Sequence, residues 1–131
     1  MIAGNFIGIG ADGTSNIANA SGIWVEGDCD GLQIGDMAYM DRNVISHNSP
    51  YGIVATSGAD SLLIINNYIG TDSTGTAPAG NSDSGISLST GYHTIGRPGA
   101  AMLFRPMVPA VFLLAPMPAL IRSLQINLAL M

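Results

Sequence analysis

The sequence predicts an all-β fold in which short parallel strands stack coil upon coil, a parallel β-solenoid. The first observation is a repeat, because Asn5-Phe6-Ile7-Gly8 returns 62 residues later as Asn67-Tyr68-Ile69-Gly70. The second is composition, since 17 glycines and many serines, threonines and asparagines among 131 residues suit many tight turns. A fixed repeat period marks a chain whose units bury their apolar faces against one another. We therefore expect about three coils over residues 1–100 and a separate segment over residues 101–131.

Four rows of apolar residues are expected to stack inside the coils. Each residue lies in a short run with the period of two that is typical of a β-strand. One row follows from aligning Asn43–Asn48 with Leu62–Asn67, an offset of 19 residues, which places Ile45 beside Ile2 and Ile64. The other expected rows are Ile23, Ile53 and Ile86; Val25, Ala55 and Leu88; and Ile34 and Ile95.

A ladder of asparagines is expected at one corner of the coils. The same alignment brings Asn5, Asn48 and Asn67 to equivalent positions. In such a ladder, side-chain amides bond to one another and to the turn backbone, so they satisfy polar groups that a tight turn leaves unpaired. The expected role of these three residues is therefore structural.

Charge limits the choice of partner. Charged residues make up 10% of the chain, whereas soluble domains average roughly 25%. The four cationic residues are all arginines, and nine acidic residues give a net charge of −5. Nucleic acid binding needs clustered lysine and arginine, so we do not expect it, whereas a polysaccharide is a candidate partner. The single cysteine, Cys29, has no partner for an internal disulfide.

Four motifs carry a family resemblance. They are Ile2-Ala3-Gly4-Asn5-Phe6-Ile7-Gly8, Arg42-Asn43-Val44-Ile45-Ser46-His47-Asn48, Gly75-Thr76 followed by Asn81 and Gly85-Ile86, and Thr94-Ile95-Gly96. Together they resemble the right-handed parallel β-helix repeats of the pectin-lyase-like superfold, most closely the arrays of very large secreted or surface-exposed bacterial proteins. The resemblance covers residues 1–99 and implies a right-handed parallel β-helix in a parent protein that is extracellular or on the cell surface. It leaves the function open, because this superfold hosts lyases, hydrolases, epimerases and non-catalytic adhesins.

Residues 101–131 depart from the repeat. The superfold's repeat would continue G-N-V-I-S-x-N-G, whereas the chain reads Ala101-Met102-Leu103-Phe104-Arg105-Pro106-Met107-Val108. Shifting the codons of these residues by one nucleotide permits N-V-I-S-A-N-G in register, so we expect a frameshift near Ala100–Ala101. The tail would then be an out-of-frame apolar segment that is irregular or forms a short helix, for which Ala119–Leu130 has suitable residues.

A membrane anchor is the rival interpretation of this tail. Pro106–Ile121 contains 16 residues without a charge. A spanning helix needs about 20 apolar residues, and the prolines in this stretch would break a helix, so we do not expect a membrane segment. No signal peptide precedes the repeats, because Ile2 and Asn5 already belong to a repeat unit. We therefore expect Met1 to stand inside a longer array.

Candidate functional residues lie in and after the second predicted strand. Trp24 stands between Ile23 and Val25 in an alternating run, so its ring should point outward, where it can stack on a sugar ring. Asp28 and Asp30 belong to a cluster of acidic residues and are candidate ligands of Ca²⁺, which takes about 6–8 oxygen ligands. The alternative for both is a solvated loop acid. No other cofactor and no catalytic residue is predicted.

Two functions from different classes are consistent with these features. We favour a non-catalytic structural or glycan-contacting β-helix segment of a bacterial surface or secreted protein. The alternative is a fragment of a polysaccharide lyase or glycoside hydrolase, in which Arg42 beside Asp41 is the candidate base. The absence of lysine, and of an acidic pair that recurs on successive coils, weighs against a catalytic groove. Uncapped coil ends leave strand edges unpaired, so we also expect self-association.

Overall fold

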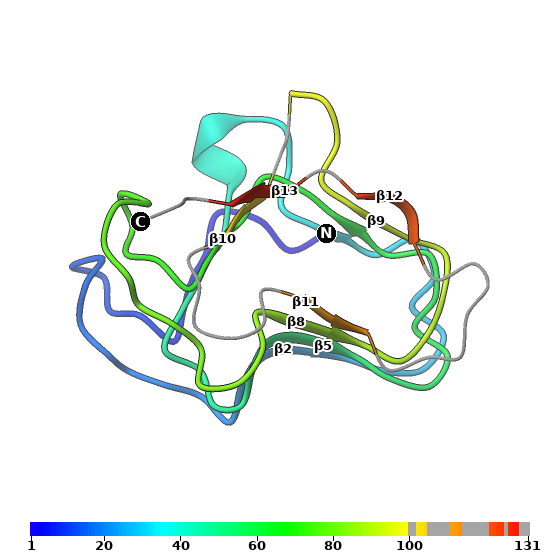
Figure 1. Ribbon diagram of the computed structural model, residues 1–131, viewed down its shortest axis with the longest axis horizontal. Coiled ribbons are helices and arrows are strands. Elements are labelled where there is room, and N and C mark those ends of the chain that lie inside the picture. The colour runs from blue at the N-terminus through cyan, green and yellow to red at the C-terminus, as the bar shows by residue number, and fades with distance from the viewer. Residues whose placement is uncertain (100–101, 105–110, 114–120, 125, 129–131) are drawn as a thin grey trace.

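The chain folds into three parallel β-sheets, as the computed structural model shows (Figure 1). The structure describes residues 1–99, 102–104, 111–113, 121–124 and 126–128. Besides strands, these residues include one short 3-10 helix, η1, at Tyr39–Asp41. Among the described residues, no helix is long and apolar enough to cross a membrane. The all-β, parallel character predicted from the repeat is therefore confirmed.

Successive strands visit the three sheets in turn. The first sheet has five strands in the order β1-β4-β7-β10-β13, and the other two have four strands each, in the orders β2-β5-β8-β11 and β3-β6-β9-β12. Strands that neighbour each other in these sheets run parallel. The bounds in the first sheet are β1 Phe6–Ile7, β4 Val44–Ile45, β7 Tyr68–Ile69, β10 Met102–Phe104 and β13 Ile126–Leu128. In the second sheet they are β2 Ser21–Val25, β5 Tyr51–Ala55, β8 Ile86–Leu88 and β11 Val111–Leu113, and in the third β3 Gln33–Ile34, β6 Leu63–Ile64, β9 His93–Ile95 and β12 Ile121–Leu124.

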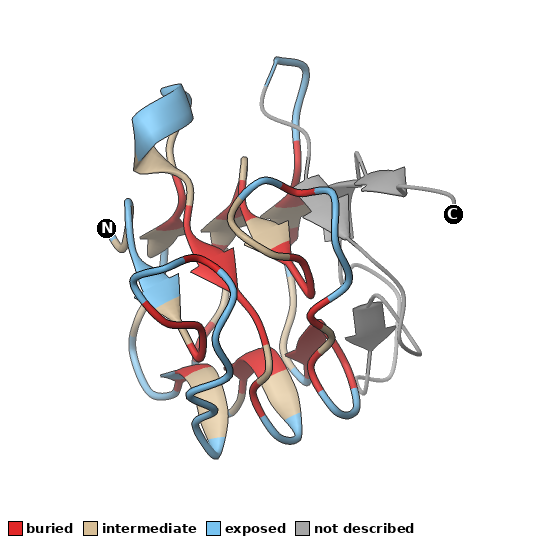
Figure 2. Cartoon of the chain, turned by 90° about the vertical axis from the view of Figure 1, so that its left-hand side faces the viewer, coloured by how far each residue is buried: buried red, intermediate tan, exposed pale blue. Residues whose placement is uncertain are grey.

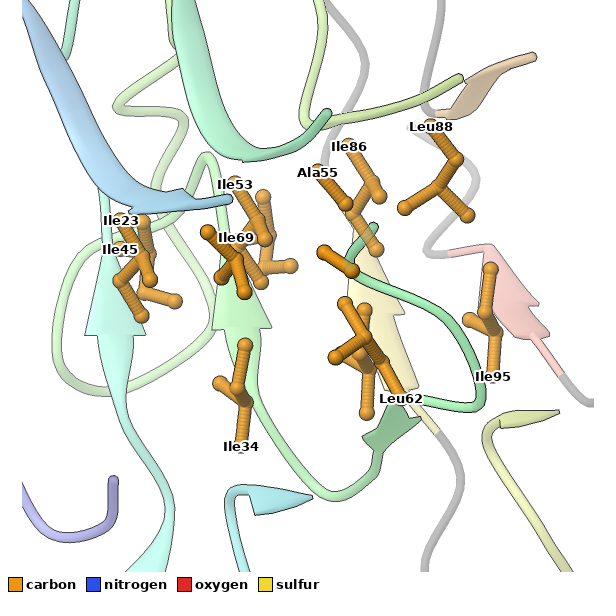
Figure 3. Packing of buried hydrophobic residues seen from close by; sticks show 13 residues of the cluster. Ile23, Ile34, Ile45, Ile53, Ala55, Leu62, Ile69, Ile86, Leu88 and Ile95 are labelled. Carbon is orange, nitrogen blue, oxygen red and sulfur yellow. The ribbon is translucent and has the colours of Figure 1, made fainter. Parts of the chain in front are cut away.

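Apolar side chains from all three sheets meet in one core between the sheets (Figure 3). Two predicted rows are confirmed there. Across strands β2, β5 and β8, Ile53 pairs with both Ile23 and Ile86, and Ala55 pairs with both Val25 and Leu88. Buried residues concentrate on the strands, whereas the connecting loops carry most of the exposed residues (Figure 2). The core therefore rests on the alternation that the sequence displays.

The predicted row of Ile2, Ile45 and Ile64 is wrong for Ile45, whereas Ile2 and Ile64 do lie in one row, on either side of Ile34. Ile45 pairs with Ile7 and Ile69 in the first sheet. Ile64 belongs to the third sheet, where it lies between Ile34 and Ile95 and so completes the row expected from those two residues. Ile2 makes an isolated bridge to Ile34. The alignment of the middle coil was shifted, and a shifted register moves side chains to the wrong position in the sheet.

The described residues after position 100 are strands and not the expected irregular or helical tail. Strand β10 pairs with β7, β11 with β8 and β12 with β9, each extending one sheet. The prediction of a short helix within Ala119–Leu130 is wrong for Ile121–Leu124 and Ile126–Leu128, which form β12 and β13. An open sheet edge offers unpaired backbone donors and acceptors, and apolar β-branched residues suit strands, so edge pairing outweighs helix propensity here. The expected frameshift position, Ala100–Ala101, lies outside the described residues.

Candidate functional site

The first asparagine ladder runs through Asn5, Asn43 and Asn67, at the start of β1, β4 and β7. Nδ2 of Asn5 donates to Oδ1 of Asn43 at 3.0 Å, and Nδ2 of Asn43 donates to Oδ1 of Asn67 at 2.8 Å. Nδ2 of Asn67 donates to the carbonyl oxygens of Ile34 and Ile65. The amides therefore bond the turns that lead into the first sheet, which is the structural role expected of a ladder.

Asn48 belongs to a second ladder. The prediction that it lies between Asn5 and Asn67 is wrong. Nδ2 of Asn19 donates to Oδ1 of Asn48 at 3.0 Å, and Nδ2 of Asn48 donates to Oδ1 of Asn81 at 3.2 Å. This ladder follows β1, β4 and β7, whereas the first ladder precedes them. The correction has the same cause as that of the isoleucine row, because the true register of the middle coil places Asn43 beside Asn67.

Trp24 is exposed on the outer face of the second sheet. Trp24 is 59% exposed, whereas its neighbours in β2, Ile23 and Val25, are buried. The indole Nε1 donates a hydrogen bond to Oε2 of Glu26 at 3.1 Å, which holds the ring in one orientation. Trp24 pairs with Val54 in β5, which is 5% exposed. The structure therefore presents a flat aromatic surface on strand β2, at one edge of this sheet.

The acidic residues after β2 lie in an exposed loop. Asp28 and Asp30 are both exposed, and Cys29 between them donates its thiol to the carbonyl oxygen of Glu26 at 3.3 Å. Within the part of the chain that the structure describes, no group of three or more histidine, cysteine, aspartate or glutamate side chains is placed to hold a metal ion. Calcium binding by Asp28 and Asp30 therefore stays a prediction.

Arg42 is held between two aromatic rings. Its guanidinium carbon lies 4.2 Å from the ring centroid of Tyr39 and 4.1 Å from that of Tyr68. Nη2 donates to Oδ1 of Asn66 at 3.3 Å. Nδ2 of Asn66 in turn donates to the carbonyl oxygens of Asp36 and Ala38. Arg42 therefore fastens the loop that contains η1 to the outer face of the first sheet, by cation–π contact and through one shared amide.

A pocket of about 440 Å³ lies beside Arg42. Sequence reasoning missed this pocket, because its wall depends on how the loop before Asn43 folds back over the sheet. The outward positions of the first sheet were a usable signal, since Phe6, Val44 and Tyr68 align once the register is correct. The lining residues are Gly4, Phe6, Tyr39, Met40, Arg42, Val44 and Ser73.

His93 is a buried histidine that faces the interior. Its Nδ1 accepts a hydrogen bond from the backbone N–H of Leu62 at 3.2 Å, and its Nε2 lies 3.3 Å from Oγ1 of Thr90. Thr90 Oγ1 also bonds to the carbonyl oxygen of Ala59 at 2.7 Å. Burial lowers the pKa of His93 below its ordinary value, although Thr90 and Asp60 act in the opposite direction. A neutral, fully buried imidazole in these contacts serves the fold and not an exposed reaction centre.

Comparisons with known proteins add no family to this picture. No protein-family model matches the chain, and no curated protein and no solved structure matches it significantly. The class that the fold defines is therefore an all-β protein of three parallel sheets through which the chain passes in turn. Its candidate functional features are the exposed Trp24 on the second sheet and the pocket beside Arg42 on the first sheet.

Proposed function

We propose that the chain is a non-catalytic, glycan-contacting segment of a right-handed parallel β-helix. In this proposal residues 1–99 make three coils, each of which contributes one strand to each sheet. The cyclic order of the strands and the two asparagine ladders support a solenoid. The sequence resemblance supports a parent protein of the bacterial surface or the extracellular space. The solenoid then acts as a long, rigid scaffold that displays contact residues on its outer faces.

The observation that carries the glycan proposal is the exposed ring of Trp24. A sugar stacks its apolar face on an aromatic ring, and the ring here is 59% exposed. The hydrogen bond from Nε1 to Glu26 orients the ring before any ligand arrives, so less side-chain entropy is lost on binding. Glu26, Asp28 and Asp30 add negative charge nearby, and that charge disfavours an acidic polysaccharide. The partner we propose is therefore a neutral glycan.

The alternative function, a polysaccharide lyase or glycoside hydrolase, has weaker support. A catalytic base must reach the proton that it abstracts. Arg42, the candidate base, is stacked between Tyr39 and Tyr68, and its Nη2 donates to Oδ1 of Asn66, so these contacts already engage its guanidinium. It also lies beside the first sheet, whereas Trp24 lies on the second sheet. A sugar stacked on Trp24 would therefore not meet this base.

Calorimetric titration with neutral oligosaccharides tests the proposal. Cellohexaose and laminarihexaose are titrated into the whole chain, and the variant Trp24→Ala is compared with Tyr92→Ala. Tyr92 is 49% exposed and directly precedes β9 of the third sheet, so it is a matched aromatic control. We expect Trp24→Ala to weaken binding roughly fivefold to tenfold and Tyr92→Ala to leave it unchanged. Equal affinity of both variants, or no binding of either glycan, would refute a role for Trp24.

A further inference from the structure

We propose that the pocket beside Arg42 binds a small organic carboxylate with an apolar, ring-sized body. The pocket has a volume of about 440 Å³, within the range of about 300–1,000 Å³ that is usual for small-molecule sites. It lies on the first sheet, whereas Trp24 lies on the second sheet. The proposal is therefore independent of glycan contact at Trp24.

Residues from the sheet and from two loops shape the pocket. Phe6 and Val44 pair across β1 and β4, and because the next residue of each strand belongs to or packs against the core, both side chains face outward. Tyr39 and Met40 of η1 are 69% and 79% exposed, and they line the pocket from the loop before Asn43. Such a lining of aromatic, aliphatic and thioether groups favours an apolar ligand body.

Arg42 favours a negative charge on that ligand. Its guanidinium contacts two tyrosine rings and the amide oxygen of Asn66, and none of these groups carries a negative charge. In the described part of the chain, its buried Nε and Nη1 atoms have no hydrogen-bond partner. A buried N–H group without a partner costs free energy, and so does a buried charge without a counter-ion. A carboxylate in the pocket relieves both costs.

In this proposal the ligand reaches these nitrogen atoms when Tyr39 moves. Nε and Nη1 are shielded from solvent, and Tyr39 is the exposed ring of the two that enclose the guanidinium. An exposed side chain changes rotamer in picoseconds to nanoseconds, so Tyr39 can turn away from the guanidinium and leave room for the ligand carboxylate. Tyr68, which is half-buried, keeps Arg42 stacked on the sheet meanwhile.

The scarcity of polar groups in the lining disfavours a sugar acid. Apart from Arg42, the side chains that line the pocket offer the hydroxyl groups of Tyr39 and Ser73. A hexuronate carries several hydroxyl groups that would lose water without gaining enough hydrogen bonds in return. An aryl carboxylate has one polar group, which Arg42 satisfies, and an apolar ring that fits the remaining surface.

Titration with three probes tests the ligand class. Naphthalene-2-carboxylate carries the ring and the charge, naphthalene-2-methanol carries the ring alone, and galacturonate carries the charge on a polar ring. We expect the naphthoate to bind the whole chain at least about tenfold more tightly than either other probe. Equal binding of the alcohol would overturn the need for a negative charge. Tighter binding of galacturonate would overturn the apolar body, and the absence of saturable naphthoate binding at millimolar concentration would overturn the site itself.

Two sets of variants locate the binding. Arg42→Gln keeps a planar group but removes the charge, and we expect it to weaken naphthoate binding about tenfold. Because this change can also loosen the loop, Met40→Glu is compared with Met40→Gln, and residue 40 is exposed enough for either side chain to leave the fold intact. The glutamate repels the probe across the pocket, so only Met40→Glu should weaken naphthoate binding, while alcohol binding stays the same. Equal affinities of the two residue-40 variants would place the probe elsewhere.

Discussion

Nδ2 of Asn43 donates a hydrogen bond to Oδ1 of Asn67 at 2.8 Å, and both residues are fully buried. The backbone N–H of Asn43 donates to the same oxygen at 3.1 Å. This pair sets the register of the first sheet, because it places Val44 and Ile45 beside Tyr68 and Ile69. The asparagine side chain thus supplies hydrogen bonds to backbone groups that have no backbone partner in the turn between two sheets.

Asn43→Ala is expected to destabilise the fold by about 3 kcal/mol. The change removes the acceptor of the Asn5 amide and the donors to Asn67 and to the carbonyl oxygen of Ile2, all of them in or beside the buried ladder. Urea unfolding measures the loss. Asn16→Ala is the control, because Asn16 is exposed and its side chain bonds within its own loop to Ala18. Similar losses for both variants would contradict a special role for the ladder.

Gly35→Ala is expected to cost more than Gly31→Ala. Both glycines have positive φ angles, +86° and +74°, so alanine is strained at either position. At Gly35 an added Cβ would also lie 1.9 Å from the carbonyl oxygen of Ile65, whereas at Gly31 nothing lies within 4 Å. We expect about 1–2 kcal/mol of destabilisation for Gly31→Ala and at least twice that for Gly35→Ala, measured by urea unfolding. Equal values would mean that the coils are not packed as closely there as the structure shows.

The stability of the protein is expected to fall as the pH drops below about 6.5 because of His93. Burial lowers the pKa of His93 in the folded state, so the unfolded chain takes up a proton first. The contribution of His93 to the free energy of unfolding is complete above the ordinary pKa of histidine. As the pH falls through that pKa, this contribution is lost at a rate of at most about 1.4 kcal/mol per pH unit. Unfolding curves from pH 7.5 to 5 measure this slope.

His93→Gln is the control for that pH dependence. Glutamine does not titrate, so the slope of the unfolding free energy between pH 7 and pH 5 should become shallower than in the parent chain. The remaining slope belongs to the other titrating groups. An unchanged slope in the variant, or a parent chain that gains stability on acidification in this range, would show that His93 is not buried in its neutral form.

Self-association is expected to increase with protein concentration. Strand β2 is the edge of the second sheet, and an edge strand offers unpaired backbone groups to another chain. Sedimentation over a hundredfold range of concentration should show growing species, and Ser21→Lys should reduce them because a charge on an edge strand opposes pairing. A monomer that melts reversibly and independently of concentration would contradict this expectation.

The sequence was informative about strands but ambiguous about register. Alternation and glycine spacing placed Ile23, Ile53 and Ile86 correctly. The register of the middle coil is ambiguous in the sequence, because either Asn43 or Asn48 can be aligned with Asn67. The triplet Asn43-Val44-Ile45 also matches Asn5-Phe6-Ile7 and Asn67-Tyr68-Ile69, and that match is the register of the structure. Local similarity alone did not decide between the two offsets, whereas hydrogen bonding between coils does.

The candidate sites also include features that the sequence predicts and features that it does not. The outward position of Trp24 followed from its buried neighbours in the strand, and its 59% exposure agrees. The stacking of Arg42 between Tyr39 and Tyr68 did not follow, because it joins a loop residue to a strand residue of the next coil. Likewise, edge pairing of the apolar residues after position 100 depends on sheets that other coils build.

The measurement that separates a scaffold from an enzyme records binding and turnover together. The whole chain is incubated with pectate and with neutral glucans, with and without Ca²⁺, while glycan binding, the absorbance of unsaturated products and the release of reducing ends are followed. We expect saturable binding of a neutral glucan that Trp24→Ala weakens, with no product under any condition. Product formation that disappears in Arg42→Ala would contradict the proposed non-catalytic function and establish the lyase alternative.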